Sequence, residues 1–168
     1  MITGVTFDNF ESISKDRIEI AQRIASDEML CKCLLCNEEN FKDYEPTQEE
    51  IEGLMWKHIY PCRYLPDTQI SASSFITMQF SYTKSEKSKF WKVGTITLYL
   101  VCHKEIIKTK YGILRYDYML QRVNQILNDT RNDTWLGRIE LSQLDEVIYD
   151  TAGNFPALRA RYVCTEQM

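Results

Sequence analysis

The chain has 168 residues, enough for one domain with a hydrophobic core and too few for two independent cores. Its formal net charge of −4 disfavours binding to nucleic acid through a broad basic surface, and no apolar run approaches the ~20 residues that a membrane helix needs. Residues 1–10 lack a basic region followed by an apolar one, so we expect no secretory signal and six reduced cysteines in a cytosolic setting.

The first third of the chain predicts two helices. Residues 1–12 show no periodic pattern and are expected to form an extended arm. A long helix should follow, with Ser14 as its N-cap, and its apolar stripe consists of Ile20, Ala21, Ile24, Cys31, Leu34 and Leu35. Residues 37–59 form an acidic insertion, in which Thr47 and Glu50 have the spacing of a capping box and predict a short second helix.

The middle of the chain carries the clearest pattern. From Phe75 to Tyr82, and again from Val93 to Cys102, apolar residues alternate with polar ones. One face would hold Ile76, Met78, Phe80, Tyr82, Ile96, Leu98, Leu100 and Cys102. A period of two predicts strands with one buried and one solvated face, and their closeness in sequence predicts an antiparallel hairpin. Residues 84–89 contain no apolar side chain and are expected to form a solvated tip.

The period then changes to that of a helix, from Tyr116 to Asn128. Its apolar stripe consists of Tyr116, Met119, Leu120, Val123, Ile126 and Leu127. A hairpin with one apolar face and a helix with one apolar stripe can bury each other, so we expect them to form the core.

The last part of the chain predicts two strands. Ile139 begins a strand whose alternation breaks at Leu144, which predicts a bulge near Ser142. Residues 150–156 should form a turn, and residues 158–164 alternate as a final strand. The order of the predicted helices and strands indicates an α+β fold in a single domain of residues 1–168. We expect an antiparallel or mixed β-sheet with a long hairpin, flanked by two main helices and one short helix.

The residues that could bind a metal or act as a nucleophile are Cys31, Cys33, Cys36, His58, Cys62, Cys102 and His103. The spacing of Cys31, Cys33 and Cys36 differs from that of a zinc knuckle. On a helix, Cys31 and Cys33 would point about 200° apart. Cys102 and His103 lie on opposite faces of a strand and cannot pair with each other. No glycine-rich phosphate loop is present. We therefore expect structural thiols, no cofactor, no metal and no catalytic residues, and metal analysis with thiol-reactivity profiling would test the alternative of an enzyme.

The hairpin tip is the strongest candidate for a partner interface. It is basic in an acidic chain, and two large aromatic side chains at its base are costly to leave in water. Our hypothesis is that the tip contacts another subunit or a neighbouring assembly, with two arginines of the final strand included. The predicted interface residues are Lys84, Lys87, Lys89, Phe90, Trp91, Arg159 and Arg161. The alternative is a solvated loop whose aromatic rings are covered by residues 37–59.

Several stretches together resemble the tail terminator (tail completion) proteins of long-tailed bacteriophages. They are the helix Asp16–Leu35, the strands Phe75-Ile-Thr-Met-Gln-Phe and Thr95-Ile-Thr-Leu-Tyr-Leu-Val-Cys-His, the helix from Leu114 to Asn128, and Leu136-Gly-Arg-Ile-Glu-Leu. The resemblance covers most of residues 14–165, and the insertion at 37–59 is longer than in the simplest members.

The resemblance implies a virion protein that is assembled in the host cytoplasm and has no catalytic residues. It would form a ring, usually of six subunits, that terminates the tail tube and joins it to the neck. Its partners would be its own copies, the tail tube protein and a neck or connector protein, with DNA only in transit through the lumen and no membrane. Another head–tail connector (neck or stopper) protein and a small cytosolic binding module are the alternatives.

Overall fold

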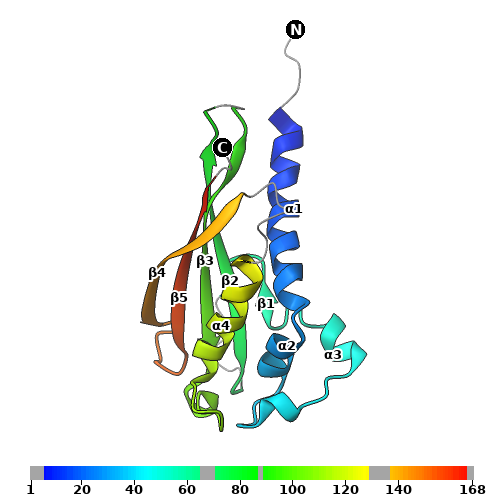
Figure 1. Cartoon of the computed structure of the whole chain (residues 1–168), viewed down its shortest axis with the longest axis vertical. Coiled ribbons are helices and arrows are strands. Elements are labelled where there is room, and N and C mark those ends of the chain that lie inside the picture. The colour runs from blue at the N-terminus through cyan, green and yellow to red at the C-terminus, as the bar shows by residue number, and fades with distance from the viewer. Residues whose placement is uncertain (1–5, 65–70, 87–88, 129–136, 166–168) are drawn as a thin grey trace.

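The computed structural model describes residues 6–64, 71–86, 89–128 and 137–165. Their elements are α1 (Thr6–Ala25), α2 (Glu28–Leu35), α3 (Gln48–Glu52), β1 (Ile59–Tyr60), β2 (Ser74–Lys84), β3 (Trp91–Cys102), α4 (Arg115–Asn128), β4 (Arg138–Ile148) and β5 (Pro156–Thr165), with short 3-10 turns at Phe41–Asp43 and Lys104–Ile106. The strands form one five-stranded sheet in the order β1-β2-β3-β5-β4 (Figure 1). Only β1 pairs in parallel, so the predicted α+β fold with a mixed sheet is confirmed.

The N-terminal helix starts earlier than predicted and is interrupted once. Residues 6–12 belong to α1, so the prediction of an extended arm is wrong for them, and residues 1–5 lie outside the described residues. Ser14 lies inside α1 and does not cap it. The chain restarts as α2 at Asp27, whose Oδ1 accepts a hydrogen bond from the backbone nitrogen of Leu30 at 2.8 Å. This N-cap replaces the single continuous helix that the apolar stripe predicts.

The core lies between one face of the sheet and the helices α1, α2 and α4 (Figure 1). The expected apolar face of the hairpin is buried there, with Ile76 and Leu98 inaccessible to solvent. The predicted helix is confirmed as α4, and Met119, Val123 and Leu127 of its stripe are buried against the sheet. This packing of α4 beside the hairpin is the arrangement that the two matching apolar patterns predict.

The opposite face of the sheet, here called the outer face, is not solvated throughout. Phe75 and Val101 point to it and are buried with Tyr60, Phe155 and Ala157 in a second apolar cluster. Tyr60 belongs to β1, which adds to the edge of β2, and Tyr64 stacks on the Tyr60 ring with 4.0 Å between the centroids. The prediction that the hairpin has one wet face is therefore wrong at this end of the sheet.

Residues 37–59 are anchored in the main core. The capping box is confirmed: the Thr47 hydroxyl accepts from the backbone nitrogen of Glu50, and the Glu50 side chain accepts from that of Thr47. Phe41 and Leu54 are inaccessible to solvent and belong to the main core cluster. The segment is thus integrated into the fold through its apolar residues, while its acidic ones remain at the surface.

The bulge predicted in the penultimate strand is confirmed. The pairing of β4 with β5 shifts register between Leu141 and Gln143, so Ser142 is the additional residue. The shift lets both Leu141 and Leu144 point to the helix-covered face of the sheet, because their β5 partners Tyr162 and Ala160 both do.

Candidate interaction surface

The far end of the hairpin extends beyond the rest of the sheet. Strand β5 pairs with β3 only from Thr95 to Val101, so the part of β3 before Thr95 is paired with β2 alone. A register shift after Ser81 makes Gly94 the additional residue, and a Cβ at Gly94 would lie 2.8 Å from Cγ2 of Thr83. We call residues 82–94 the hairpin arm. Its bulge increases the local twist and turns the arm relative to the sheet.

Two backbone hydrogen bonds close the base of the hairpin tip. The backbone nitrogen of Ser85 donates to the carbonyl oxygen of Phe90 at 2.8 Å, and that of Lys89 donates to the carbonyl oxygen of Ser85 at 3.0 Å. Ser85 is buried, whereas the prediction expects a solvated loop at this position. Lys89 has φ of +59°, a left-handed conformation that non-glycine residues seldom adopt. The turn therefore fixes the direction in which the chain leaves and re-enters the strands.

The predicted aromatic and basic residues lie together on the hairpin arm. Phe90 and Trp91 are each 43% exposed, and Lys84 and Lys89 are exposed as well. Trp91 is the register partner of Lys84, so the two side chains share one face. Residues 37–59, which could have covered the rings, lie at the other end of the molecule (Figure 1). Lys87 lies outside the described residues.

Helix α1 holds the root of the hairpin arm. Nε of Arg17 donates to the Tyr82 hydroxyl at 2.8 Å, and the guanidinium lies over the rings of Tyr82 and Phe80, with its central carbon 5.5 and 5.7 Å from their centroids. Burial raises the pKa of Tyr82, so this hydroxyl stays protonated in the ordinary pH range. A cation stacked on two aromatic rings fixes the arm against the helix while its tip remains accessible.

The two predicted arginines lie elsewhere. Arg159 and Arg161 are on the outer face of β5, in the middle of the sheet, and Arg159 forms an ion pair with Asp145 of β4 at 3.0 Å. The structure thus separates the predicted interface into the hairpin arm and a second location on the outer face. Periodicity places both arginines on the solvated side of the strand, but it does not give their distance from the tip.

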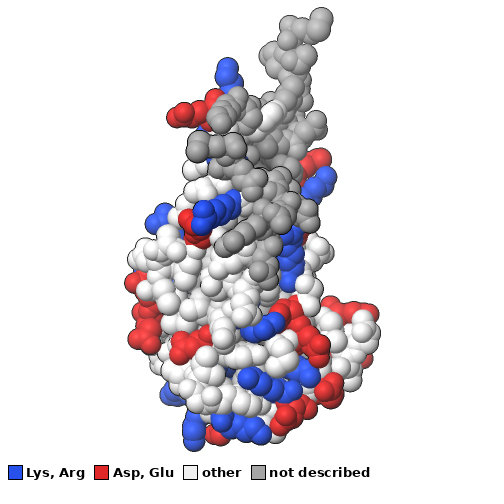
Figure 2. Space-filling model, in the orientation of Figure 1, with Lys and Arg blue, Asp and Glu red and all other residues white. Residues whose placement is uncertain are grey.

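An exposed apolar strip on β4 was not predicted from the sequence. Leu141, Leu144 and Ile148 are 37%, 45% and 62% exposed, although they point to the same face as the buried Ile139. We call these three residues the β4 strip. Figure 2 shows largely uncharged surface over this side of the molecule, with acidic side chains along its margin. The break of alternation at Leu144 was the signal in the sequence, but it was interpreted only as a bulge.

The cysteines and histidines are engaged in the fold. Five cysteines are buried, and only Cys62 is half-buried. Burial raises the pKa of Cys33 and Cys102 to about 12, which keeps both thiols protonated and poorly nucleophilic. Nδ1 of His58 lies 2.9 Å from the Ser74 carbonyl oxygen. Over the described ranges, no group of three or more His, Cys, Asp or Glu side chains is placed to hold a metal ion.

Comparison with protein families finds a match. A family model described as YomW matches residues 27–164, a range that includes the hairpin arm and both C-terminal strands. No curated protein and no solved structure matches the chain. Among the residues that the structure describes, no helix is long and apolar enough to cross a membrane.

Proposed function

Since the chain belongs to the YomW family, which is phage-related, we propose that it is a structural protein of a bacteriophage virion that acts where the tail meets the neck. Copies of the chain assemble head to tail into a ring, of six subunits in the arrangement we favour. The ring terminates the tail tube and joins it to the neck, with the tail tube protein and a neck or connector protein as its other partners.

The hairpin arm is the observation that carries this proposal. Residues 82–94 contain four lysines and one glutamate in a chain whose net charge is −4, and Phe90 and Trp91 add apolar surface beside them. A projecting basic and aromatic element is suited to an acidic, partly apolar neighbour. A head-to-tail ring needs two different complementary surfaces on each subunit, and the arm supplies one of them.

The charge of the chain also suits a ring through which DNA passes. A net negative protein does not bind phosphates tightly through its general electrostatic field, so DNA can move through the lumen without being held. In this proposal the protein acts through its surfaces and not through catalysis. Its place is the virion, after assembly in the host cytoplasm.

The test is the mass of the purified protein over a range of concentrations, measured by sedimentation velocity and examined by negative-stain electron microscopy. We expect assembly that depends on concentration and ring-shaped particles with a central opening. A fixed small species at every concentration would instead indicate a small binding module. Cosedimentation with isolated tail tubes then distinguishes a tail-terminating ring from a ring that belongs elsewhere in the neck.

The contribution of the hairpin arm is tested by reversing its charge. The variant Lys84→Glu, Lys87→Glu and Lys89→Glu should assemble more weakly than the parent, and the difference should be largest at low salt, where screening is least. The matched control reverses three exposed lysines outside the arm, Lys57, Lys104 and Lys108. Equal assembly of the two variants at every ionic strength would exclude the arm as an interface.

A further inference from the structure

We infer that the surface which receives the hairpin arm is strand β4 of the neighbouring copy, through the β4 strip and the acidic residues beside it. The inference rests on the proposed ring and names the second of its two complementary surfaces. It follows from the position of β4 in the sheet, from its exposed apolar side chains and from its charge.

Strand β4 is the last strand of the sheet. It pairs with β5 along its whole length from Arg138 to Ile148, and within the described ranges no strand pairs with its other side. Alternate residues of this eleven-residue strand therefore present backbone groups at an open edge, which the bulge at Ser142 divides into two parts. Such an edge is a ready template for pairing with a strand of another chain unless it is blocked.

The β4 strip supplies the apolar part of this surface. On the same face of the same strand, Ile139 is 4% exposed, because the end of α4 covers it, and Ile148 is 62% exposed. Helix α4 packs against β3, β5 and β4 (Figure 1), and the Tyr116 hydroxyl donates to Glu146 of β4 at 3.2 Å, yet Leu141, Leu144 and Ile148 stay exposed. Leu144 and Ile148 lie on this face with the exposed Glu146 between them, and such a mixed surface suits large aromatic side chains flanked by lysines. Phe90 and Trp91 of the hairpin arm are such side chains, and both are themselves 43% exposed.

The charge of β4 favours contact with the hairpin arm of a neighbouring copy over pairing with the β4 strand of that copy. Strand β4 carries one arginine against Glu140, Asp145 and Glu146. Glu140 is paired with Arg138 at 2.6 Å and Asp145 with Arg159 at 3.0 Å, so among the described residues of the subunit Glu146 is the one of these three carboxylates without an ion pair. Glu146 lies close to Asp117 of α4, and burial together with the charge of Glu146 raises the pKa of Asp117. Two β4 strands paired edge to edge would bring these acidic side chains together, and like charges across a strand pair are destabilising. The lysines of the hairpin arm, in contrast, would be attracted to the acidic side chains of β4.

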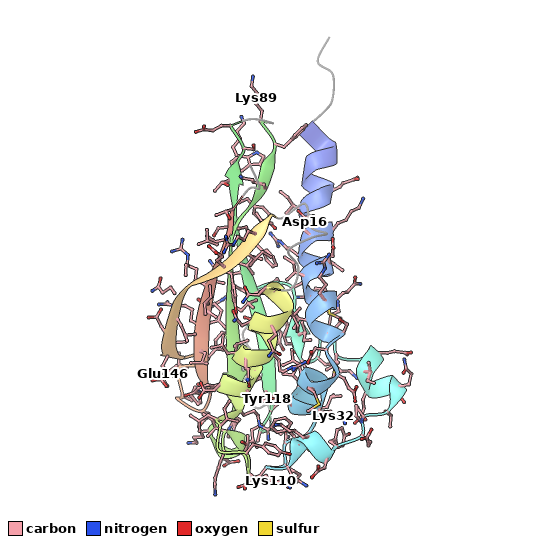
Figure 3. All side chains as sticks on the ribbon, viewed as in Figure 1. Asp16, Lys32, Lys89, Lys110, Tyr118 and Glu146 are labelled. Carbon is pink, nitrogen blue, oxygen red and sulfur yellow. The ribbon has the colours of Figure 1, made fainter. Side chains whose placement is uncertain are left out.

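The contact must join two copies of the chain. Figure 3 shows Lys89 at the tip of the arm and Glu146 near the other end of the sheet. The two surfaces are different and lie apart on one subunit, which is the requirement for a heterologous contact that can close a ring.

The decisive experiment is a charge swap read as the association constant from sedimentation velocity at low salt. The arm variant Lys84→Glu and Lys89→Glu, and the strand variant Glu140→Lys and Glu146→Lys, should each weaken assembly about tenfold or more. A chain that carries all four changes again presents opposite charges at every interface and should recover to within about threefold of the parent. Recovery is a readout that simple damage to the fold would not give.

A second pair of variants tests the apolar part independently. Leu144→Ser with Ile148→Ser should weaken assembly about tenfold or more, because both side chains are exposed in the subunit and are covered only in the ring. The matched control is Ile51→Ser with Trp56→Ser, two apolar residues exposed outside β4 and the arm. Thermal melting checks that each variant is folded.

The outcomes separate this inference from the proposed ring. If the parent protein forms rings and both β4 variants assemble like the parent, β4 is not the receiving surface, while the ring stands. Loss of assembly in the Ile51 and Trp56 control alone would assign the contact to residues 37–59 and overturn the inference. A parent protein that never assembles overturns the ring and this inference together.

Discussion

Nη1 of Arg115 donates a hydrogen bond to the carbonyl oxygen of Cys33 at 2.8 Å, and this contact joins the start of α4 to the last turn of α2. Arg115 is inaccessible to solvent. Its guanidinium also donates to the carbonyl oxygens of Cys36, Glu38 and Ile106. A buried cation without such partners would be very costly, and here carbonyl groups at the negative end of α2 replace the lost water. The side chain therefore links three segments that are distant in sequence.

Replacing this guanidinium should be severely destabilising. Arg115→Lys leaves one ammonium group that cannot reach four carbonyl oxygens in different directions, so several of them lose a buried partner. We expect the free energy of unfolding to fall by at least about 3 kcal/mol, measured by urea denaturation. Arg161→Lys, at an exposed position on β5, is the control and should change it by no more than about 0.5 kcal/mol. Similar values for the two variants would contradict the role assigned to Arg115.

Truncation of a side chain in the α4 stripe should lower the free energy of unfolding more where the side chain is more deeply buried. Leu127 is 1% exposed and Leu120 is half-buried, although both belong to the same helical stripe. Leu127→Ala should therefore lower the free energy of unfolding by about 2–5 kcal/mol, as buried leucine truncations do. Leu120→Ala should cost clearly less, and the same denaturation curves compare the two. The reverse order would mean that α4 is rotated relative to the sheet.

Asp16 should make stability depend on pH. Burial, and next the charge of Glu19, raise the pKa of Asp16 to about 6 in the folded protein, above its ordinary value of 3.8. Because the folded state holds this proton more tightly, the contribution of Asp16 to stability is complete below about pH 4 and is lost as the pH rises through 6.

The variant Asp16→Asn isolates this effect, since it removes the charge and leaves the other carboxyl groups in place. Its advantage over the parent should grow between pH 4 and pH 7, measured as the difference in melting temperature. A shift of this size corresponds to at most about 3 kcal/mol, and partial solvent access reduces the expected gain to about 1 kcal/mol. A difference that is constant over this range would contradict the raised pKa.

Trp56 is expected to be strained where it stands. It has φ of +69° and is 58% exposed, so it has an unfavourable backbone conformation with little burial of its ring to compensate. Trp56→Gly removes the strain, whereas Trp56→Ala keeps it and removes the same ring. We expect the glycine variant to be the more stable of the two by about 1 kcal/mol in thermal denaturation. An alanine variant of equal stability would show that the positive φ costs nothing here.

The elements with local signals could be predicted from the sequence. The alternation in 75–82 and 93–102, the stripe of α4, the capping box at Thr47 and the bulge at Ser142 were all predicted correctly. Each depends on the period of a strand or a helix, or on a hydrogen bond between residues three apart in the chain. Such patterns are written within about a dozen residues and need no knowledge of what packs against them.

The way in which these elements pack together depends on contacts between distant residues and could not be predicted from the sequence. The stripe of α1 and α2 runs past Asp27, but that side chain caps α2 and is held by Arg122 of α4 at 2.5 Å, so the helix breaks there. Phe75 is buried on the supposedly wet face because the distant Tyr60 packs on it.

Which strand lies at the edge of the sheet likewise depends on the pairing of strands that are far apart in the sequence. The order β3-β5-β4 leaves β4 outermost and Leu141, Leu144 and Ile148 exposed, although they point to the same face as the buried Ile139. Strand order, like the burial of Arg115, depends on contacts between residues far apart in the chain, and periodicity carries no information about those contacts.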